Sequence, residues 1–142
     1  MIFKGKKGAF IEFKILEYAS SNSSGFESDL NWIRFLFKVN TNLEKSESTD
    51  SGIMTSELEP FLYWLKDIAE EKEPDNRIFE FFDYYITFEL IGNIFNEIKI
   101  IKISNGSEDK IMDAFLSIDE LHEIINELAK EAKKYPYRHS VY

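Results

Sequence analysis

The sequence predicts an α+β fold, a mostly antiparallel twisted sheet of about six or seven strands with two amphipathic helices packed on it. Three observations support this class. Every second residue from Ile33 to Val39 is apolar, which is the period of a β-strand. Two segments carry apolar residues at helical spacing, and strand-like runs with short connections lie between them. A chain of 142 residues suits one domain, so we expect a single unit over residues 1–142.

The N-terminal part is predicted to contain two paired strands. Residues Phe10–Tyr18 alternate until the pattern slips at Leu16, which indicates a bulge or a sheet edge. Residues 29–39 are apolar on one face and mixed on the other, so this strand is predicted to be central in its sheet. A polar loop over residues 19–28 connects the two strands. The polar segment Asn40–Gly52 is predicted to be either a mobile hairpin tip or a long surface loop.

The first helix is predicted over Thr55–Lys72, where apolar residues recur at i, i+3, i+4 and i+7 over three turns. Ser56 and Glu59 have the spacing of a capping box, in which each side chain bonds the backbone amide of the other residue. Pro60 is tolerated only within the first turn of a helix. The regular helix is therefore expected to begin close to Glu59.

The second half is predicted to add a short antiparallel meander and a final helix. The expected strands are Arg77–Phe82, Tyr84–Ile91, Asn96–Ser104 and Ile111–Leu116. Gly92-Asn93 and Asn105-Gly106 are typical of hairpin turns, the second of type I′. A second capping box, Ser117 to Glu120, opens a helix that is predicted to continue to Lys134.

Composition limits the classes of function. The chain has 26 acidic and 17 basic residues and a formal net charge of −9, which disfavours nucleic acid and anionic membranes as partners. The alternative is that excess acid only keeps the protein soluble. There is no cysteine, which excludes disulfides and thiolate metal sites. No apolar run reaches the roughly 20 residues of a membrane span, and no signal peptide is evident, so we expect a cytoplasmic protein.

Catalytic signals are sparse. The two histidines, His122 and His139, form no pair with metal-ligand spacing, and no Gly-rich phosphate loop follows a predicted strand. His122 flanks the apolar stripe of the second helix and is expected to be a half-buried packing residue. We therefore expect no enzyme, no metal and no cofactor, although a carboxylate pair assembled by folding stays open as an alternative.

The outer faces of the two helices differ. The second helix shows mixed signs, which is typical of a solvated face. The first shows an acidic stripe around one aromatic, made of Glu59, Tyr63, Asp67 and Glu70, with Glu71 just beyond. An anionic surface around a tyrosine suits recognition of a basic protein. The alternative is again an ordinary solvated face.

Several segments in order along the chain resemble the WapI family of immunity proteins. They are Asp29–Ile33, Thr55–Leu58 with Trp64–Leu65, Ile78–Phe81 with Tyr85–Phe88, Phe115–Leu121 and Tyr135–Arg138. One position departs from the family pattern, because Asp83 is followed by Tyr84 where the family has an acidic residue followed by proline. This departure puts the geometry of that turn in doubt.

The resemblance implies a function in toxin neutralisation. Such proteins bind the toxic C-terminal domain of a cognate secreted contact-dependent toxin, and an RNA-cleaving toxin domain would carry a basic cleft. We therefore expect occlusion of a basic partner, with the acidic stripe as the toxin-binding surface. The family pattern implies structural roles for Trp32, in the core, and Arg138, as a latch. The alternative is an intracellular α+β scaffold or an uncharacterised enzyme.

Overall fold

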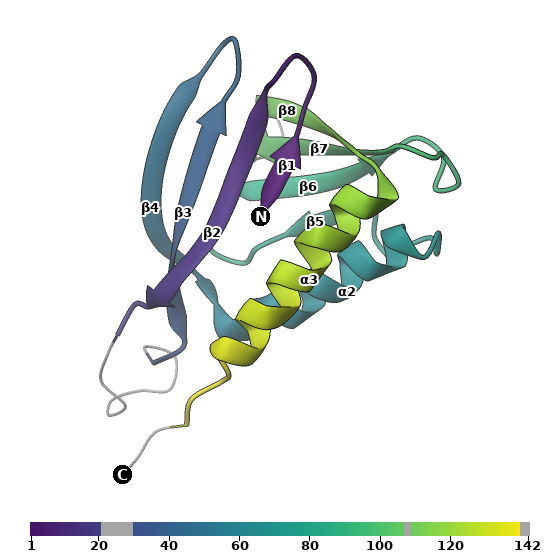
Figure 1. Ribbon diagram of the computed structural model, residues 1–142. Helices are drawn as coiled ribbons and strands as arrows, with labels where there is room; N and C mark the ends of the chain where they lie inside the picture. Colours follow the sequence, from purple (N-terminus) through teal and green to yellow (C-terminus); the bar gives the residue numbers. More distant parts are fainter. Residues whose placement is uncertain (21–29, 107–108, 140–142) are drawn as a thin grey trace.

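The computed structural model describes residues 1–20, 30–106 and 109–139, and it contains two antiparallel four-stranded sheets and two α-helices (Figure 1). The first sheet consists, in order, of β1 (Ile2–Lys4), β2 (Phe10–Tyr18), β3 (Trp32–Asn40) and β4 (Lys45–Met54). The second consists of β5 (Ile78–Glu80), β6 (Ile86–Ile91), β7 (Lys99–Asn105) and β8 (Asp109–Leu116). The helical elements are the 3₁₀ turn η1 (Thr55–Glu57), α2 (Leu58–Ala69) and α3 (Ile118–Lys134).

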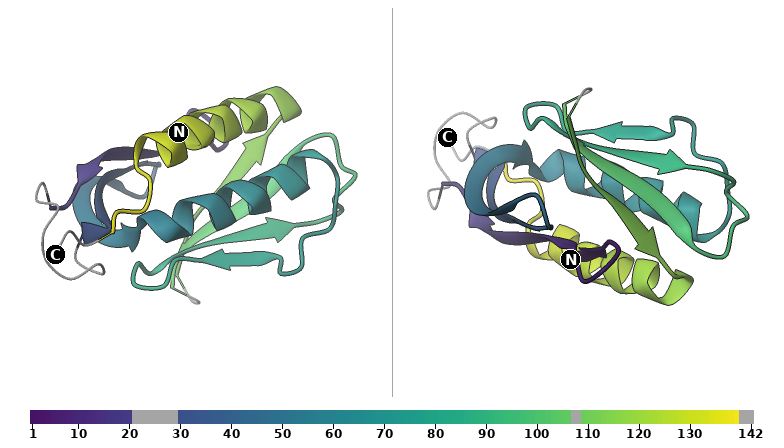
Figure 2. Two further views of the ribbon diagram at one scale, coloured as in Figure 1. Left: turned by 90° about the horizontal axis from the view of Figure 1, so that it is seen from below. Right: turned by 90° about the horizontal axis from the view of Figure 1, so that it is seen from above.

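The predicted α+β class is confirmed, with eight strands divided between two sheets rather than joined in one. Both sheets are meanders in which neighbours in sequence are neighbours in space, as short connections require. The chain between β4 and β5 forms η1 and α2, and this helical connection separates the two meanders. Figure 2 shows α2 between α3 and the second sheet, with the first sheet at one end of the helix pair.

The prediction that the strand around Ile33–Val39 is central is confirmed. β3 pairs with β2 on one side and with β4 on the other. Its inward residues Ile33, Phe35, Phe37 and Val39 are all buried. The register of β2 shifts between Ile15 and Glu17, which is the irregularity that the pattern indicated. From residue 21 to 28 the predicted polar loop lies outside the described residues.

The prediction for Asn40–Gly52 is wrong over most of its length, because β4 occupies Lys45–Met54. Only Thr41–Glu44 forms the turn, where the Thr41 hydroxyl accepts bonds from the Leu43 and Glu44 amides at 3.2 and 3.0 Å. β4 lies at the edge of its sheet, and its first half is exposed. Pairing with β3 therefore stabilises a strand that no apolar periodicity in the sequence predicts.

The regular first helix begins at Leu58, close to Glu59 as predicted, but it ends at Ala69 rather than Lys72, and the predicted cap at Ser56 is wrong. The Ser56 side chain does not cap α2, because η1 leads directly into the helix at Leu58. The Glu57 carboxylate accepts a bond from the Met54 amide at 3.0 Å, which satisfies a donor before the first turn. Pro60 falls within the first turn of α2, where a missing N–H costs nothing.

The last helix agrees with its prediction. α3 runs from Ile118 to Lys134, and Ser117 and Glu120 form the reciprocal capping box at 3.2 and 3.0 Å. Of the four strands before it, β5 and β6 are shorter than predicted, β7 is shifted, and β8 begins two residues earlier than predicted. Gly92 begins a longer connection to β7 than a two-residue hairpin. The hairpin predicted near Asn105-Gly106 is confirmed, because β7 and β8 pair antiparallel there. Its predicted type I′ form is wrong, because Asn105 belongs to β7 and pairs with Asp109.

Aromatic side chains fill the space where the sheets and helices meet. Phe3 from β1 contacts Phe88 from β6, with ring centroids 5.4 Å apart. On α2, Phe61 is fully buried and its ring lies 4.9 Å from that of Phe88 and 5.3 Å from that of Phe81. These contacts join both sheets to α2 in one core, and the surfaces described below are fixed to it.

Candidate functional site

The acidic stripe is divided by the structure into two parts. At the first end of α2, Glu59 and Tyr63 are exposed, and the Tyr63 hydroxyl donates to Glu59 Oε1 at 3.1 Å. This hydrogen bond raises the pKa of Tyr63. The Lys66 ammonium lies 5.7 Å from the centroid of the Tyr63 ring. Asp67, one turn further on, is half-buried. This end of the stripe therefore carries a cation as well as its anions.

The other end of the stripe is partly neutralised by lysines. Glu70 pairs with Lys72 at 3.1 Å. Glu71 adopts a positive φ of 59° just after the helix and lies 3.9 Å from the Lys99 ammonium. Lys99 is buried and also donates to the carbonyl oxygens of residues 94 and 96. Glu71 therefore lies beside the buried Lys99 ammonium, which holds the β6–β7 connection. This cation leaves less of the Glu71 charge available to a partner.

A groove of about 540 Å³ lies between α2, α3 and the chain after α3. Its lining residues include Glu59, Tyr63, Lys66, Lys133 and Tyr137. Carboxylate, ammonium and phenol groups all face it. The charge of this groove is mixed, so it favours neither sign of partner strongly.

A second exposed surface comes from the run Phe81-Phe82-Asp83-Tyr84-Tyr85 between β5 and β6. Phe81 is buried, and Tyr84 packs against Phe35 and Phe37 with ring centroids 4.7 and 6.0 Å apart. Phe82 and Tyr85 turn the other way and are 88% and 79% exposed. Folding therefore uses two of these rings as anchors and presents two others to solvent.

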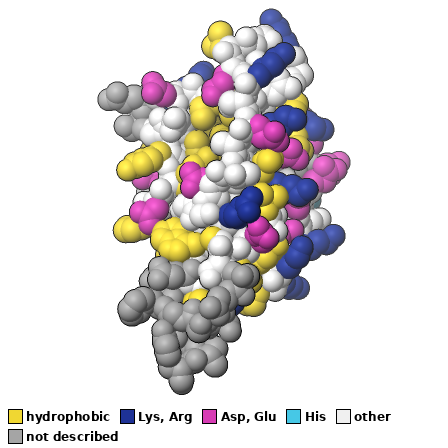
Figure 3. All heavy atoms as spheres, turned by 90° about the vertical axis from the view of Figure 1, so that its left-hand side faces the viewer, with side chains coloured by type: hydrophobic (Ala, Val, Ile, Leu, Met, Phe, Trp, Pro, Cys, Tyr) yellow, Lys and Arg dark blue, Asp and Glu magenta, His cyan; other side chains and the backbone are white. Residues whose placement is uncertain are grey.

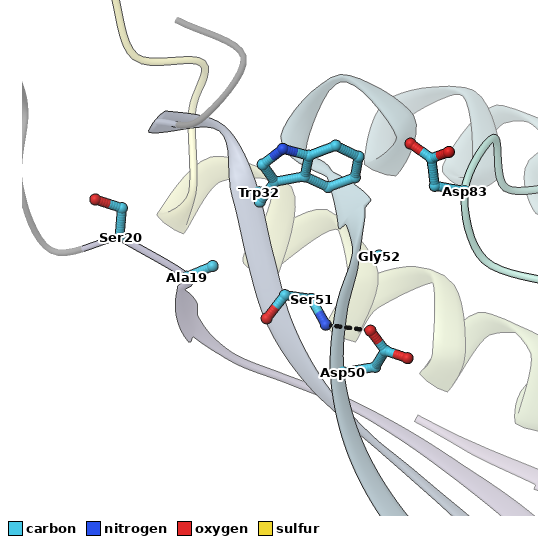
Figure 4. A pocket seen from close by; sticks show the side chains of 7 residues that line it. All are labelled: Ala19, Ser20, Trp32, Asp50, Ser51, Gly52 and Asp83. Atoms are coloured by element: carbon cyan, nitrogen blue, oxygen red, sulfur yellow. Dashed lines mark hydrogen bonds between the residues drawn. The ribbon is translucent and has the colours of Figure 1, made fainter. Parts of the chain in front are cut away.

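Two hollows border this run, and both are lined by Asp50 of β4 and by Asp83. One, of about 530 Å³, is also lined by Trp32, which is half-buried rather than a full core residue as expected. In the view of Figure 4, the Trp32 ring and the Asp83 carboxylate both lie above Gly52 of β4. The other hollow, of about 370 Å³, extends along β4 to Glu44 and is bordered by Tyr85.

We call Trp32, Asp50, Phe82, Asp83 and Tyr85 the aromatic–acidic surface. Among the residues that the structure describes, no lysine or arginine lines either of the two hollows that this surface borders. Figure 3 shows the side of the molecule over β4, where hydrophobic and acidic side chains lie toward the left, and most lysines and arginines lie toward the right together with further acidic side chains. A basic, partly apolar partner fits such a surface.

Glu57 connects this surface to the start of α2. Its Oε2 accepts a bond from the Phe82 amide at 2.7 Å, while its Oε1 holds the Met54 amide. A Cβ atom at Gly52 would lie 3.4 Å from the carbonyl oxygen of Asp83, so β4 and the β5–β6 connection are in close contact. The aromatic–acidic surface is thus continuous with the first end of α2 and is held on its inner side by fixed contacts.

Tyr84 gives this part of the molecule a spectroscopic signature. Burial raises the pKa of Tyr84 to about 12, and the Asp50 carboxylate acts in the same direction. The stability contributed by the neutral phenol is therefore fully present below pH 10 and is lost as the pH rises from 10 to about 12. A tyrosinate absorbance titration is expected to show a late step that Tyr84→Phe removes and Tyr85→Phe retains. If the Tyr84→Phe variant keeps the late step, the raised pKa of the Tyr84 phenol is contradicted.

Sequence reasoning missed the aromatic–acidic surface. A signal was present, because five residues that include four aromatics cannot all face one core when they lie at the end of a strand. The absence of the family's proline after Asp83 marks the same place. What could not be read was the partner segment, since β4 supplies Asp50 and was not predicted as a strand.

Arg138 is confirmed as a latch, because its guanidinium donates to the carbonyl oxygens of Leu30 and Ser20 and lies 3.7 Å from the centroid of the Tyr18 ring. His122 is exposed rather than half-buried. Among residues 1–20, 30–106 and 109–139, no three acidic, histidine or cysteine side chains come together as a metal site would require. In the same part of the chain no helix has the length and apolar character to cross a bilayer.

Comparison with known proteins identifies a family for this chain. The model of the immunity protein WapI-like family matches residues 1–136. No curated protein and no solved structure matches the chain significantly. The family match covers both sheets, both helices, the acidic stripe and the aromatic–acidic surface, and it ends one residue before Tyr137 of the α2–α3 groove.

Proposed function

Because the chain belongs to the WapI-like immunity protein family, we propose that it binds and neutralises the toxic C-terminal domain of a cognate secreted contact-dependent toxin. The observation that carries this proposal is the family match over residues 1–136, nearly the whole chain. Immunity to such a toxin is needed where the toxin domain acts, which is the cytoplasm. Neutralisation then requires binding and no chemical step, so the proposal needs neither a cofactor nor a metal.

The proposed mechanism is occlusion of a basic cleft on a toxin domain that cleaves RNA. A nuclease must hold phosphate groups with lysine and arginine. A protein with a net charge of −9 is attracted to such a cleft, and its carboxylates take the positions of phosphates. Rigid surface groups lose little entropy on binding, which favours a tight complex. The exposed aromatic and acidic side chains near the start of α2 support this mechanism.

The test uses the toxin domain that is encoded directly upstream of this chain. Cells that express the toxin domain alone should die, and cells that also express this chain should survive. The two proteins should co-purify, and an equimolar amount of this chain should stop degradation of total RNA by the purified toxin domain. Survival without complex formation would contradict binding, and steady turnover of a nucleotide or small metabolite by this chain alone would point to the enzyme alternative.

We also propose that the first end of the acidic stripe lies at the contact with the toxin. Tyr63→Ala with Asp67→Lys is expected to leave the fold intact and to weaken toxin binding about tenfold, because it removes an exposed ring and reverses a charge. Glu70 and Glu71 contribute less, since lysines already pair with them. Titration calorimetry with the toxin domain measures the change.

A matched control lies on α3, where His122 and Glu123 are both exposed. His122→Ala with Glu123→Lys removes one ring and reverses one charge in the same way, and it is expected to leave affinity unchanged. Equal affinities for the Tyr63 and His122 double variants would exclude the stripe from the contact without affecting the proposed function.

A further inference from the structure

We propose that the cognate toxin domain docks on the aromatic–acidic surface, with its basic side chains in the two hollows beside Asp50 and Asp83. The inference rests on the proposed function and names the surface by which it operates. The sequence alone pointed to α2. The structure contributes three independent arguments for the side formed by β4 and the β5–β6 connection.

The first argument is the exposure of Phe82 and Tyr85, at 88% and 79%. Folding gains nothing from apolar rings left in water, and adjacent exposed aromatics are typical of binding surfaces. Leu43 and Phe95 are also exposed, at 99% and 69%, but each lies in a turn and neither lines the hollows described above. Tyr85 is exposed and lines the second hollow, and Phe82 directly precedes Asp83, which lines both hollows. Tyr63 and Tyr137 are exposed beside the α2–α3 groove, but the lining of that groove includes lysines.

The charge of the two hollows also favours a basic partner at this surface. Asp50 and Asp83 line both hollows, and Glu44 lines the second, whereas within residues 1–20, 30–106 and 109–139 no lysine or arginine lines either hollow. In the described residues no ion pair involves Asp50 or Asp83. The α2–α3 groove, by contrast, includes lysines. Uncompensated carboxylates beside aromatic rings suit arginine and lysine, which pair with the carboxylates and pack on the rings.

The aromatic–acidic surface is also held in a fixed position by the residues beneath it. Phe81 and Tyr84 fix the connection from the inside, and the Glu57 carboxylate holds the amide of Phe82 at 2.7 Å. β4 is anchored in turn by its pairing with β3. A surface held in this way is ordered before binding, so little conformational entropy is lost when the toxin docks.

The test compares two pairs of substitutions by titration calorimetry with the toxin domain encoded upstream. Phe82→Ala with Tyr85→Ala is expected to weaken binding about 100-fold, because hot-spot aromatics are removed. Asp50→Asn with Asp83→Asn is expected to weaken binding about tenfold at low salt, mainly through slower association, and the difference should shrink at high salt. Thermal unfolding checks that each variant is folded.

Two controls match these variants. Leu43→Ala with Phe95→Ala removes a similar exposed apolar area, and Glu97→Gln with Glu123→Gln removes the same charge from exposed positions. Both should bind like the wild type. If folded variants of the aromatic–acidic surface also bind like the wild type, the docking surface is wrong while the proposed function stands. If the wild-type chain itself fails to bind the toxin domain or to protect cells, the proposed function fails as well.

Discussion

Replacing Phe61 with alanine is expected to lower the free energy of unfolding by about 3–5 kcal/mol. Phe61 is fully buried, and its ring lies between those of Phe79, Phe81 and Phe88 at 4.9 to 5.3 Å. Truncation removes apolar contact and leaves a cavity where α2 meets the second sheet. Because a domain of this size is stable by about 5–15 kcal/mol, this single change removes a large part of its stability. Urea unfolding followed by circular dichroism measures the loss.

Tyr63→Ala is the matched control for Phe61→Ala. Tyr63 lies on the same helix two residues further on, but its side chain is 55% exposed. Its truncation is expected to change the free energy of unfolding by no more than about 0.5 kcal/mol. Similar losses in the two variants would mean that the core is not centred on Phe61.

The second large effect is expected at Arg138, where substitution by alanine should cost about 2–3 kcal/mol. The guanidinium donates to the carbonyl oxygens of Leu30 and Ser20 and lies over the ring of Tyr18. Without it, part-buried carbonyl groups lose a charged donor, and the chain after α3 loses one of its attachments to the region around the first sheet. Asn31 adds to this attachment by bonding both backbone groups of Arg138.

Arg138→Lys separates charge from geometry. A lysine keeps the positive charge but lacks the planar fork that reaches two acceptors and stacks on a ring. We expect it to recover only part of the stability that Arg138→Ala loses, measured by the same urea titration. A loss below about 0.5 kcal/mol for Arg138→Ala, within the range of ordinary surface substitutions, would contradict the latch.

Local patterns predicted much of the fold because burial on one face leaves a period in the sequence. The stripe of α3 and its Ser117 cap gave that helix its correct bounds, and the alternation of β3 gave its central place. β4 was missed because only Ile53 and its neighbours turn toward the core, so Lys45–Ser51 has no period to read. The prediction of a cap at Ser56 was wrong because residues 55–57 form the 3₁₀ turn η1.

The candidate site was predicted only in part for a similar reason. A helical wheel correctly exposes Glu59 and Tyr63, but it cannot show that Lys99, 28 residues after Glu71 in the sequence, comes within 3.9 Å of that carboxylate. It also cannot show that Phe82 comes to Glu57, 25 residues away in the sequence. These contacts depend on how the second sheet packs against α2.

By itself the sequence determined the class of the fold, both α-helices, the central strand and the family, because each of these follows from spacings within one segment or from ordered segments along the chain. Only the tertiary structure decided that the strands form two sheets and that Asp50 and Asp83 line the same hollows. The physical reason is that a surface is made by side chains from different segments. Their meeting depends on the packing of rings such as the buried Phe61 and the half-buried Tyr84, which brings β4 and the β5–β6 connection together.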